Sequence, residues 1–282
     1  MNLGSVGSRA EAPIGVFDSG VGGLSVLNAL REAMPLERFV YFADTAHAPY
    51  GERGDAHVSE RTRDVARYLI RSHRVKALVV ACNTATAAAV HLVRNEYQGL
   101  PVIGVEPALK PAVAASATGR IGVLATRGTL RSAKFEALHA SLAGQADFML
   151  RPCDGLAAAI EAHDAERIAA LCREHMGALG RLGTAQGEID SVVLGCTHYP
   201  FVAETLRAHA PAAVRFFETG EPVAQQTRRL LTAGNQLASA GHGQVALWTS
   251  GAAEALDAAA ERWLRGPAAP AHRAEVPLHQ AA

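Results

Sequence analysis

The sequence predicts an α/β protein with two pseudo-symmetric halves, each a doubly wound, mainly parallel sheet. Short apolar runs alternate with segments of helical periodicity, a pattern typical of sheets covered on both faces. Two of these runs also resemble each other. Residues 77–81 lead into Cys82-Asn-Thr, and residues 191–195 lead into Cys196-Thr-His.

The two halves also begin alike. Residues 14–18 read Ile-Gly-Val-Phe-Asp and residues 121–125 read Ile-Gly-Val-Leu-Ala, and each run leads through a small polar turn into a helix. The expected strands are 14–18, 39–43, 77–81, 102–105, 121–125, 192–195, 214–217 and 245–249. The expected helices are 22–34, 56–72, 84–96, 130–142, 165–182, 202–210, 223–232 and 253–264.

These elements predict a discontinuous first lobe. We expect residues 13–106 and 214–265 to form the lobe that carries Cys82, because strands at 214–217 and 245–249 would enlarge its sheet. Residues 107–213 would form the second lobe, with Cys196. The Gly/Ser-rich residues 1–12 and the Pro/Ala-rich residues 266–282 are expected to be flexible tails.

Composition limits the classes of function. Of 282 residues, 49% are hydrophobic and 19% charged, and Lys+Arg and Asp+Glu both number 27. This balance predicts a buried core and no nucleic-acid or anionic-membrane partner. No signal peptide or membrane-spanning run is visible. The spacing of the four cysteines fits neither a zinc site nor a disulfide framework, so we expect reduced thiols in a cytoplasmic protein without a metal.

The cysteines of the repeated runs are the first candidates for chemistry. Each is expected at the C-terminal end of a parallel strand, where open α/β sheets bind ligands. A single cysteine there is more often a structural residue, but the duplication favours function. Asn83 or Thr84 would cap the helix after Cys82, and that helix end is expected to lower the pKa of the Cys82 thiol. Two thiols at one cavity suit a reaction that needs an acid and a base on opposite faces of a carbon atom.

Polar residues near the other turns are further candidates. His198 follows Cys196 closely and could move a proton or orient the thiol. Asp18 and Ser19 precede Gly-Val-Gly-Gly, where the backbone can approach a ligand and the helix start can bind an anion. Asp18 could hold an ammonium group, help a thiol ionise, or simply cap the helix. The Tyr50 hydroxyl could bond a substrate oxygen, although a plain turn would explain its motif equally well.

Together these motifs resemble the glutamate racemases of the cofactor-independent aspartate/glutamate racemase superfamily. The matching segments are residues 17–24, 49–51, 81–85 and 195–200, in the family order. The resemblance implies two α/β lobes with the active site in the cleft between them. It also implies an isomerase without a cofactor that acts on a small molecule, glutamate, and supplies D-glutamate for peptidoglycan. It leaves a homodimer possible. Relatives commonly carry Asp-Ser where this chain has Glu218-Thr219.

The resemblance also implies roles for individual residues. Cys82 and Cys196 match the two catalytic thiols, which would serve the D- and L-isomer respectively. Asp18 and His198 would tune these thiols, together with Glu161, which matches a looser motif. The positions that match substrate contacts are Asp18, Ser19, Tyr50, Gly51, Asn83, Thr84, Thr197 and His198. Three alternatives stay open: a racemase for aspartate or another amino acid, a non-catalytic amino-acid-binding module, and a cysteine hydrolase.

Overall fold

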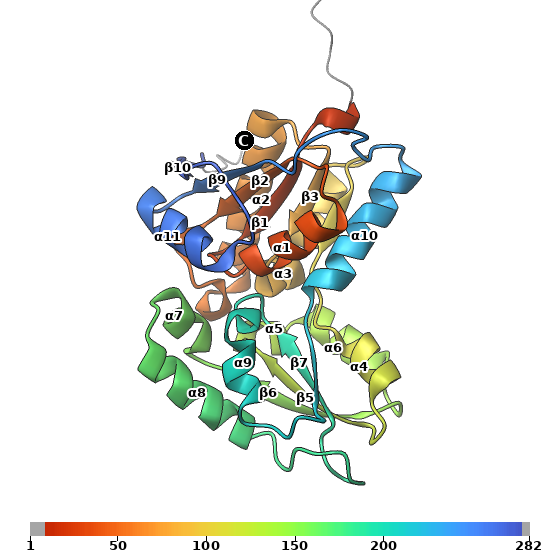
Figure 1. Cartoon of the computed structure of the whole chain (residues 1–282). Coiled ribbons are helices and arrows are strands. Elements are labelled where there is room, and N and C mark those ends of the chain that lie inside the picture. Colours follow the sequence, from red (N-terminus) through yellow and green to blue (C-terminus); the bar gives the residue numbers. More distant parts are fainter. Residues whose placement is uncertain (1–8, 278–282) are drawn as a thin grey trace, which may run out of the picture.

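The computed structural model describes residues 9–277, which form two lobes, each built on one parallel sheet (Figure 1). The first sheet has six strands, in the spatial order β10 (His272–Arg273), β9 (Val245–Thr249), β2 (Phe39–Ala43), β1 (Ile14–Asp18), β3 (Ala77–Val80) and β4 (Val102–Gly104). The second has four, in the order β6 (Asp147–Pro152), β5 (Arg120–Ala125), β7 (Ser191–Gly195) and β8 (Arg215–Phe217). This is the α/β architecture that the sequence predicts.

Helices cover both faces of each sheet. In the first lobe, one face carries α1 (Leu24–Ala33), α10 (Gly220–Ala233) and α11 (Ala253–Trp263), and the other carries α2 (Asp55–His73) and α3 (Asn83–Glu96). In the second lobe, α7 (Leu156–Glu161), α8 (Ala165–Gly177) and α9 (Ala203–Arg207) cover one face, and α4 (Leu109–Ala115), α5 (Arg127–Leu130) and α6 (Ala133–Ala140) cover the other. Short 3₁₀ turns are η1 (Arg9–Glu11), η2 (Thr45–His47), η3 (Tyr50–Glu52) and η4 (Tyr199–Val202).

The same strand order occurs in both sheets. If the first four strands of each half are numbered along the chain, both sheets read second, first, third, fourth, which is β2-β1-β3-β4 and β6-β5-β7-β8. In such a sheet the strand order reverses between the first and the third strand, and ligands bind beyond the carboxyl ends of these two strands. Cys82 follows β3 and Cys196 follows β7, the third strand of each sheet.

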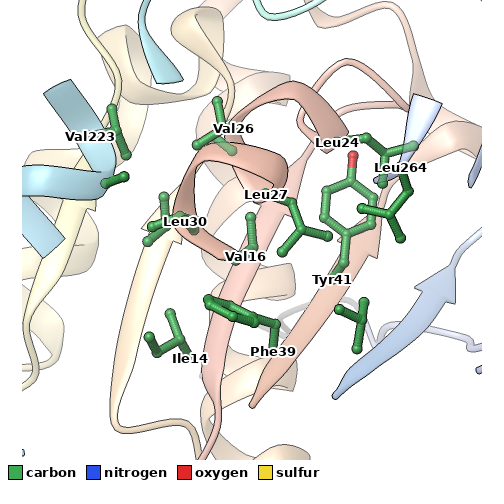
Figure 2. Packing of buried hydrophobic residues seen from close by; sticks show 14 of the residues in the cluster. Ile14, Val16, Leu24, Val26, Leu27, Leu30, Phe39, Tyr41, Val223 and Leu264 are labelled. Atoms are coloured by element: carbon green, nitrogen blue, oxygen red, sulfur yellow. The ribbon is translucent and has the colours of Figure 1, made fainter. Parts of the chain in front are cut away.

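Alternating side chains of the strands fill the layers on the two faces of the first sheet. Ile14 and Val16 of β1 point to the α1 face, and Phe17 points to the α2 face. Figure 2 shows Leu27 and Leu30 of α1 above this part of the sheet. Burial of each such side chain contributes about 1.5–3 kcal/mol, so this packing fixes α1 and the glycine-rich turn before it.

The placement of β8 corrects one expectation. Residues 214–217 were expected to enlarge the first sheet, but β8 pairs with β7 in the second sheet. Ser191 of β7 is the register partner of Arg215 of β8. This pairing joins segments that are separated in the sequence, so no local pattern reveals it. The chain returns to the first lobe through α10, which packs against α1 (Figure 1).

Helices α4 and α7 and two strand segments also differ from the sequence-based expectation, which contained none of them. Strand β6 was not expected, because its partly exposed residues give no continuous apolar run. Residues 272–273 pair with β9, so this part of the expected C-terminal tail is held on the sheet. Residues 1–8 and 278–282 of the expected tails lie outside the described residues. Between residues 9 and 277, no helix has both the length and the apolar character needed to cross a membrane.

Candidate active site

Both repeated cysteines line a single cavity between the two lobes. The cavity has a volume of about 400 Å³, within the range of small-molecule sites, and the carboxyl ends of strands from both sheets surround it. The structure therefore brings together most of the residues that the sequence singles out. Those that line the cavity are Ser19, Tyr50, Gly51, Cys82, Asn83, Thr84, Glu161, Cys196, Thr197 and His198.

Cys82 occupies the N-terminal cap of α3. Its sulfur accepts a hydrogen bond from the backbone N–H of Ala85 at 3.4 Å and lies 3.6 Å from the Ser19 hydroxyl. We expected this helix end to lower the pKa of the thiol, but the structure contradicts that expectation. Burial, reinforced by the negative charge of Asp18, raises the pKa of Cys82 well above its ordinary value and outweighs the hydrogen bonds. Cys82 is therefore a protonated thiol at neutral pH.

Asp18 does not line the cavity but lies fully buried at the end of β1. Its Oδ2 accepts hydrogen bonds from the backbone N–H of Gly23 at 2.8 Å and of Gly20 at 3.4 Å, so it fixes the turn before α1. Its Oδ1 is buried without a hydrogen-bond partner. Burial raises the pKa of Asp18 to about 6, although the charge of His198 opposes this shift.

The second thiol belongs to a linear array of polar groups. The Cys196 sulfur lies 3.7 Å from Nδ1 of His198, and Nε2 of His198 lies 2.7 Å from Oε1 of Glu161. Burial disfavours the imidazolium, but its hydrogen bonds with Cys196 and Glu161 prevail and hold the pKa of His198 well above its ordinary value. Burial opposes the charged form of Glu161 too, yet His198 keeps the pKa of this carboxyl below its usual range. A charged His198 thus lies beside the Cys196 sulfur.

The glycine-rich turn of the first lobe packs directly against this array. The backbone N–H of Val21 donates to Oε1 of Glu161 at 3.1 Å, which joins the two lobes. A Cβ atom at Gly20 would lie 1.8 Å from Oε1 of Glu161, and one at Gly22 would lie 2.4 Å from Nδ1 of His198. A side chain at Gly20 or Gly22 would therefore force Glu161 or His198 to move.

A buried ionic network holds one wall of the cavity. Arg61 binds Asp44 through two hydrogen bonds, at 2.8 and 3.1 Å, and the Tyr50 hydroxyl donates to the same carboxylate at 2.5 Å. The Tyr50 hydroxyl has one proton and donates it to Asp44. The hydroxyl therefore does not donate to a substrate oxygen, as the sequence suggested it could. The network instead positions the turn that brings Gly51 to the cavity.

Three polar side chains at the cavity fit a carboxylate or an ammonium group. Both the amide nitrogen and the amide oxygen of Asn83 are buried without a hydrogen-bond partner. Because buried polar atoms are rarely left unpaired in folded proteins, these atoms indicate a ligand. Thr84 and Thr197 line the same cavity, from the turns that follow Cys82 and Cys196.

The second lobe also contributes residues that sequence reasoning missed. Thr126, Arg127, Cys153 and Asp154 line the cavity at the ends of β5 and β6. Thr126 could have been found from the internal repeat, because Thr126 follows β5 as Ser19 follows β1. Among residues 9–277, no group of His, Cys, Asp and Glu side chains could hold a metal ion.

Comparisons with known proteins agree with this geometry. A family model described as Asp/Glu/Hydantoin racemase matches residues 24–227. A glutamate racemase of Stutzerimonas stutzeri is 47% identical over 228 residues, which cover 81% of this chain and 85% of the relative. One of Pseudomonas paraeruginosa is 44% identical over 249 residues, covering 88% and 92%. A glutamate racemase of Bacillus anthracis superposes with a TM-score of 0.84 at 29% identity, covering 96% of this chain and 100% of that one.

A second solved structure gives the same result. The glutamate racemase of Thermus thermophilus, in complex with β-chloro-D-alanine, has a TM-score of 0.78 at 34% identity, covering 95% of this chain and 99% of that one. The family model, the relatives and the solved structures all match residues of both lobes. The chain belongs to the Asp/Glu/hydantoin racemase family.

Proposed function

We propose that the protein is an isomerase that interconverts L- and D-glutamate by moving a proton between two thiols. The observation that carries this proposal is that Cys82 and Cys196 line one cavity, each from the third strand of a different sheet. One sulfur removes the Cα proton while the other returns a proton to the opposite face, so the configuration inverts. Neither step requires a cofactor.

The two thiols have different environments. Burial keeps Cys82 protonated, whereas Cys196 lies beside His198, which is paired with Glu161. By the family resemblance Cys196 acts on the L-isomer, and the protonated Cys82 then supplies the proton that yields D-glutamate. After one turnover the proton pattern is reversed and matches D-glutamate.

The Cα proton is a very weak acid, so the developing negative charge needs stabilisation. The unpaired amide of Asn83 and the hydroxyls of Thr84 and Thr197 are placed to bind the α-carboxylate, on which that charge accumulates. The roles of Asp18, Ser19 and Gly51 are more indirect. Ser19 contacts the Cys82 sulfur, Asp18 fixes the turn beneath it, and Gly51 shapes the wall.

The cellular role follows from the proposed product. D-glutamate is a building block of bacterial peptidoglycan, and we infer that the enzyme supplies it in the cytoplasm. All four cysteines are free thiols, which is typical of a reducing compartment.

Incubation with L-glutamate in deuterated water, without any added cofactor, tests the proposal. We expect D-glutamate to appear on chiral chromatography and deuterium to appear at Cα, and we expect Cys82→Ala and Cys196→Ala to abolish both. The matched control is Cys172→Ala, since this buried thiol lies outside the cavity. Aspartate measured in parallel tests the alternative substrate. Full racemisation by Cys82→Ala would refute the two-thiol mechanism.

A further inference from the structure

A buried tyrosine of the first lobe takes no part in the chemistry described so far. Tyr41 lies on β2 and belongs to the core on the face of the sheet that α1 covers, where its side chain is fully buried. Figure 2 shows its ring beneath α1, with the hydroxyl directed at the start of this helix. The hydroxyl donates to the carbonyl oxygen of Gly20 at 2.7 Å. Tyr41 thus reaches the glycine-rich turn without lining the cavity.

The peptide group that accepts this hydrogen bond also contacts the second lobe. The carbonyl of Gly20 and the N–H of Val21 belong to one trans peptide bond, and this N–H donates to Oε1 of Glu161 at 3.1 Å. In a trans peptide the two groups point in opposite directions, so the core of the first lobe holds one side of the peptide and the second lobe holds the other. The same Oε1 lies 2.7 Å from Nε2 of His198. These hydrogen bonds form one series from Tyr41 to His198.

We propose that Tyr41 is a positioning residue for the proton transfer at Cys196 and acts through the peptide bond that follows Gly20. That peptide holds Glu161, and Glu161 in turn holds His198 beside the Cys196 sulfur. The inference rests on the proposed function, because the series has a task only if this sulfur exchanges a proton with the substrate. Tyr41 itself contacts no reacting atom.

Two effects transmit the hydrogen bond of Tyr41. A bond to the carbonyl oxygen polarises the peptide group, so that the N–H on its other side becomes a stronger donor. Bonds at both ends also fix a peptide that lies between Gly20 and Gly22, residues with wide conformational freedom. Burial, reinforced by the charges of Asp18 and Glu161, raises the pKa of Tyr41 well above its ordinary value. The hydroxyl therefore keeps the proton that it donates.

The far end of this peptide acts on the charge of Glu161. Burial opposes that charge, but His198 and the hydrogen bond from the Val21 N–H outweigh burial and keep the pKa of the carboxyl below its usual range. A weaker donor at Val21 would raise the pKa of Glu161 and leave its carboxyl freer to move. Both changes reach His198 although every side chain that lines the cavity is unaltered.

Steady-state kinetics of Tyr41→Phe tests the proposal. The substitution removes the hydroxyl and keeps the ring that packs beneath α1. We expect kcat to fall roughly threefold to tenfold, the loss that one hydrogen bond predicts. KM for glutamate should change by less than about twofold, because Tyr41 does not line the cavity. Tyr68→Phe is the matched control, since Tyr68 packs against Trp248 and also lies outside the cavity lining. It should keep both constants.

A double-mutant cycle separates an effect through this series from a general loosening of the turn. If Tyr41 acts through Glu161, Tyr41→Phe should change kcat little in a Glu161→Gln background, so the two losses are not additive in free energy. In a Ser19→Ala background, which removes the contact with the Cys82 sulfur, the full loss from Tyr41→Phe should persist. Additivity with Glu161→Gln, or coupling to Ser19 instead, would overturn the proposal.

The imidazole of His198 gives a readout that does not depend on turnover. Proton NMR of protein with nitrogen-labelled histidine reports the proton between Nε2 of His198 and Oε1 of Glu161, and His198→Gln identifies this resonance by its loss. Tyr41→Phe should shift the resonance, and Tyr68→Phe should leave it in place. A ring-fluorinated tyrosine in place of Tyr41 is a stronger donor, so it should shift the resonance in the opposite direction, and it serves as the test if the phenylalanine variant does not fold.

The outcomes distinguish this inference from the proposed function. A His198 resonance that neither the loss nor the strengthening of the Tyr41 donor moves would overturn the role of Tyr41. Absence of racemisation in the wild type would refute the proposed function instead, whatever the NMR result.

Discussion

At the residue scale, the two sulfurs have unlike surroundings. Cys82 is a buried thiol near the carboxylate of Asp18, whereas Cys196 lies beside a histidine that Glu161 keeps charged. The same side chain thus has different electrostatic surroundings at the two positions. The difference comes from neighbouring residues rather than from the strand ends that present the thiols.

Replacing either cysteine with serine should show which thiol acts on which isomer. A serine hydroxyl is a far weaker acid than a thiol, so each Cys→Ser variant should lose racemisation by at least roughly a hundredfold. We expect Cys82→Ser to exchange the Cα proton of L-glutamate faster than that of D-glutamate, and Cys196→Ser to show the reverse. Proton NMR in deuterated water measures both rates. Equal rates for the two isomers in both variants would contradict the assignment.

The buried carboxyl of Asp18 should reduce stability at neutral pH. Its pKa is about 6 in the folded protein and 3.8 as the ordinary value, so the folded state binds the proton more tightly. Stability from this group is therefore greatest below pH 4, falls as the pH rises to 6, and is then lower by roughly 3 kcal/mol. Asp18→Asn should raise the unfolding free energy at pH 8 by a part of this amount and lower activity. Urea unfolding at pH 8 and pH 4 measures the difference, and an equal effect at both pH values would show that the charge is not responsible.

At the scale of elements, the turn between β1 and α1 sets the distance between the lobes. Gly22→Ala should reduce kcat/KM by about a hundredfold, because a Cβ placed 2.4 Å from His198 must displace the imidazole or separate the lobes. Gly177→Ala is the control, since its Cβ would meet nothing within 4 Å. That variant should keep full activity and an equal or higher melting temperature. Normal activity in Gly22→Ala would mean that the turn yields without moving His198.

Elements with strong local patterns were predictable from the sequence. The strands at 14–18, 39–43 and 245–249 have the predicted bounds, because each is an uninterrupted run in a sheet buried on both faces. The edge strand β6 has no such run, and the partner of β8 depends on contacts between distant residues. The cysteines could be found because their strands are duplicated. Arg127 and Asp154 could not, since their place at the cavity depends on how the second lobe faces the first.

At the scale of the whole molecule, the cavity belongs to neither lobe alone. Its walls come from both sheets, and the Val21–Glu161 and Thr84–Thr126 contacts join the lobes around it. Ser25 adds a third link, because its hydroxyl donates to the carbonyl oxygen of Thr197 at 2.8 Å. A ligand that fills the cavity would therefore contact both lobes at once.

Ligand binding should accordingly stabilise the entire chain. With Cys82→Ser, in which racemisation is slow, glutamate at a hundred times its Kd should raise the unfolding free energy by about 2.7 kcal/mol. Thermal unfolding followed by circular dichroism gives the shift in melting temperature, with glutamine as the control for the distal carboxylate. A melting temperature that does not change at saturating glutamate would exclude a site shared by both lobes.

The repeated strand order has a consequence for the energetics of the reaction. In an achiral solvent two enantiomers have equal free energy, so a catalyst of their interconversion gains nothing by favouring either one at equilibrium. Because one half of the scaffold repeats the other, each enantiomer meets a similar arrangement of strand ends and thiol. Any kinetic bias between forward and reverse turnover must then arise where the halves differ, in the carboxylate beneath one sulfur and the imidazole beside the other.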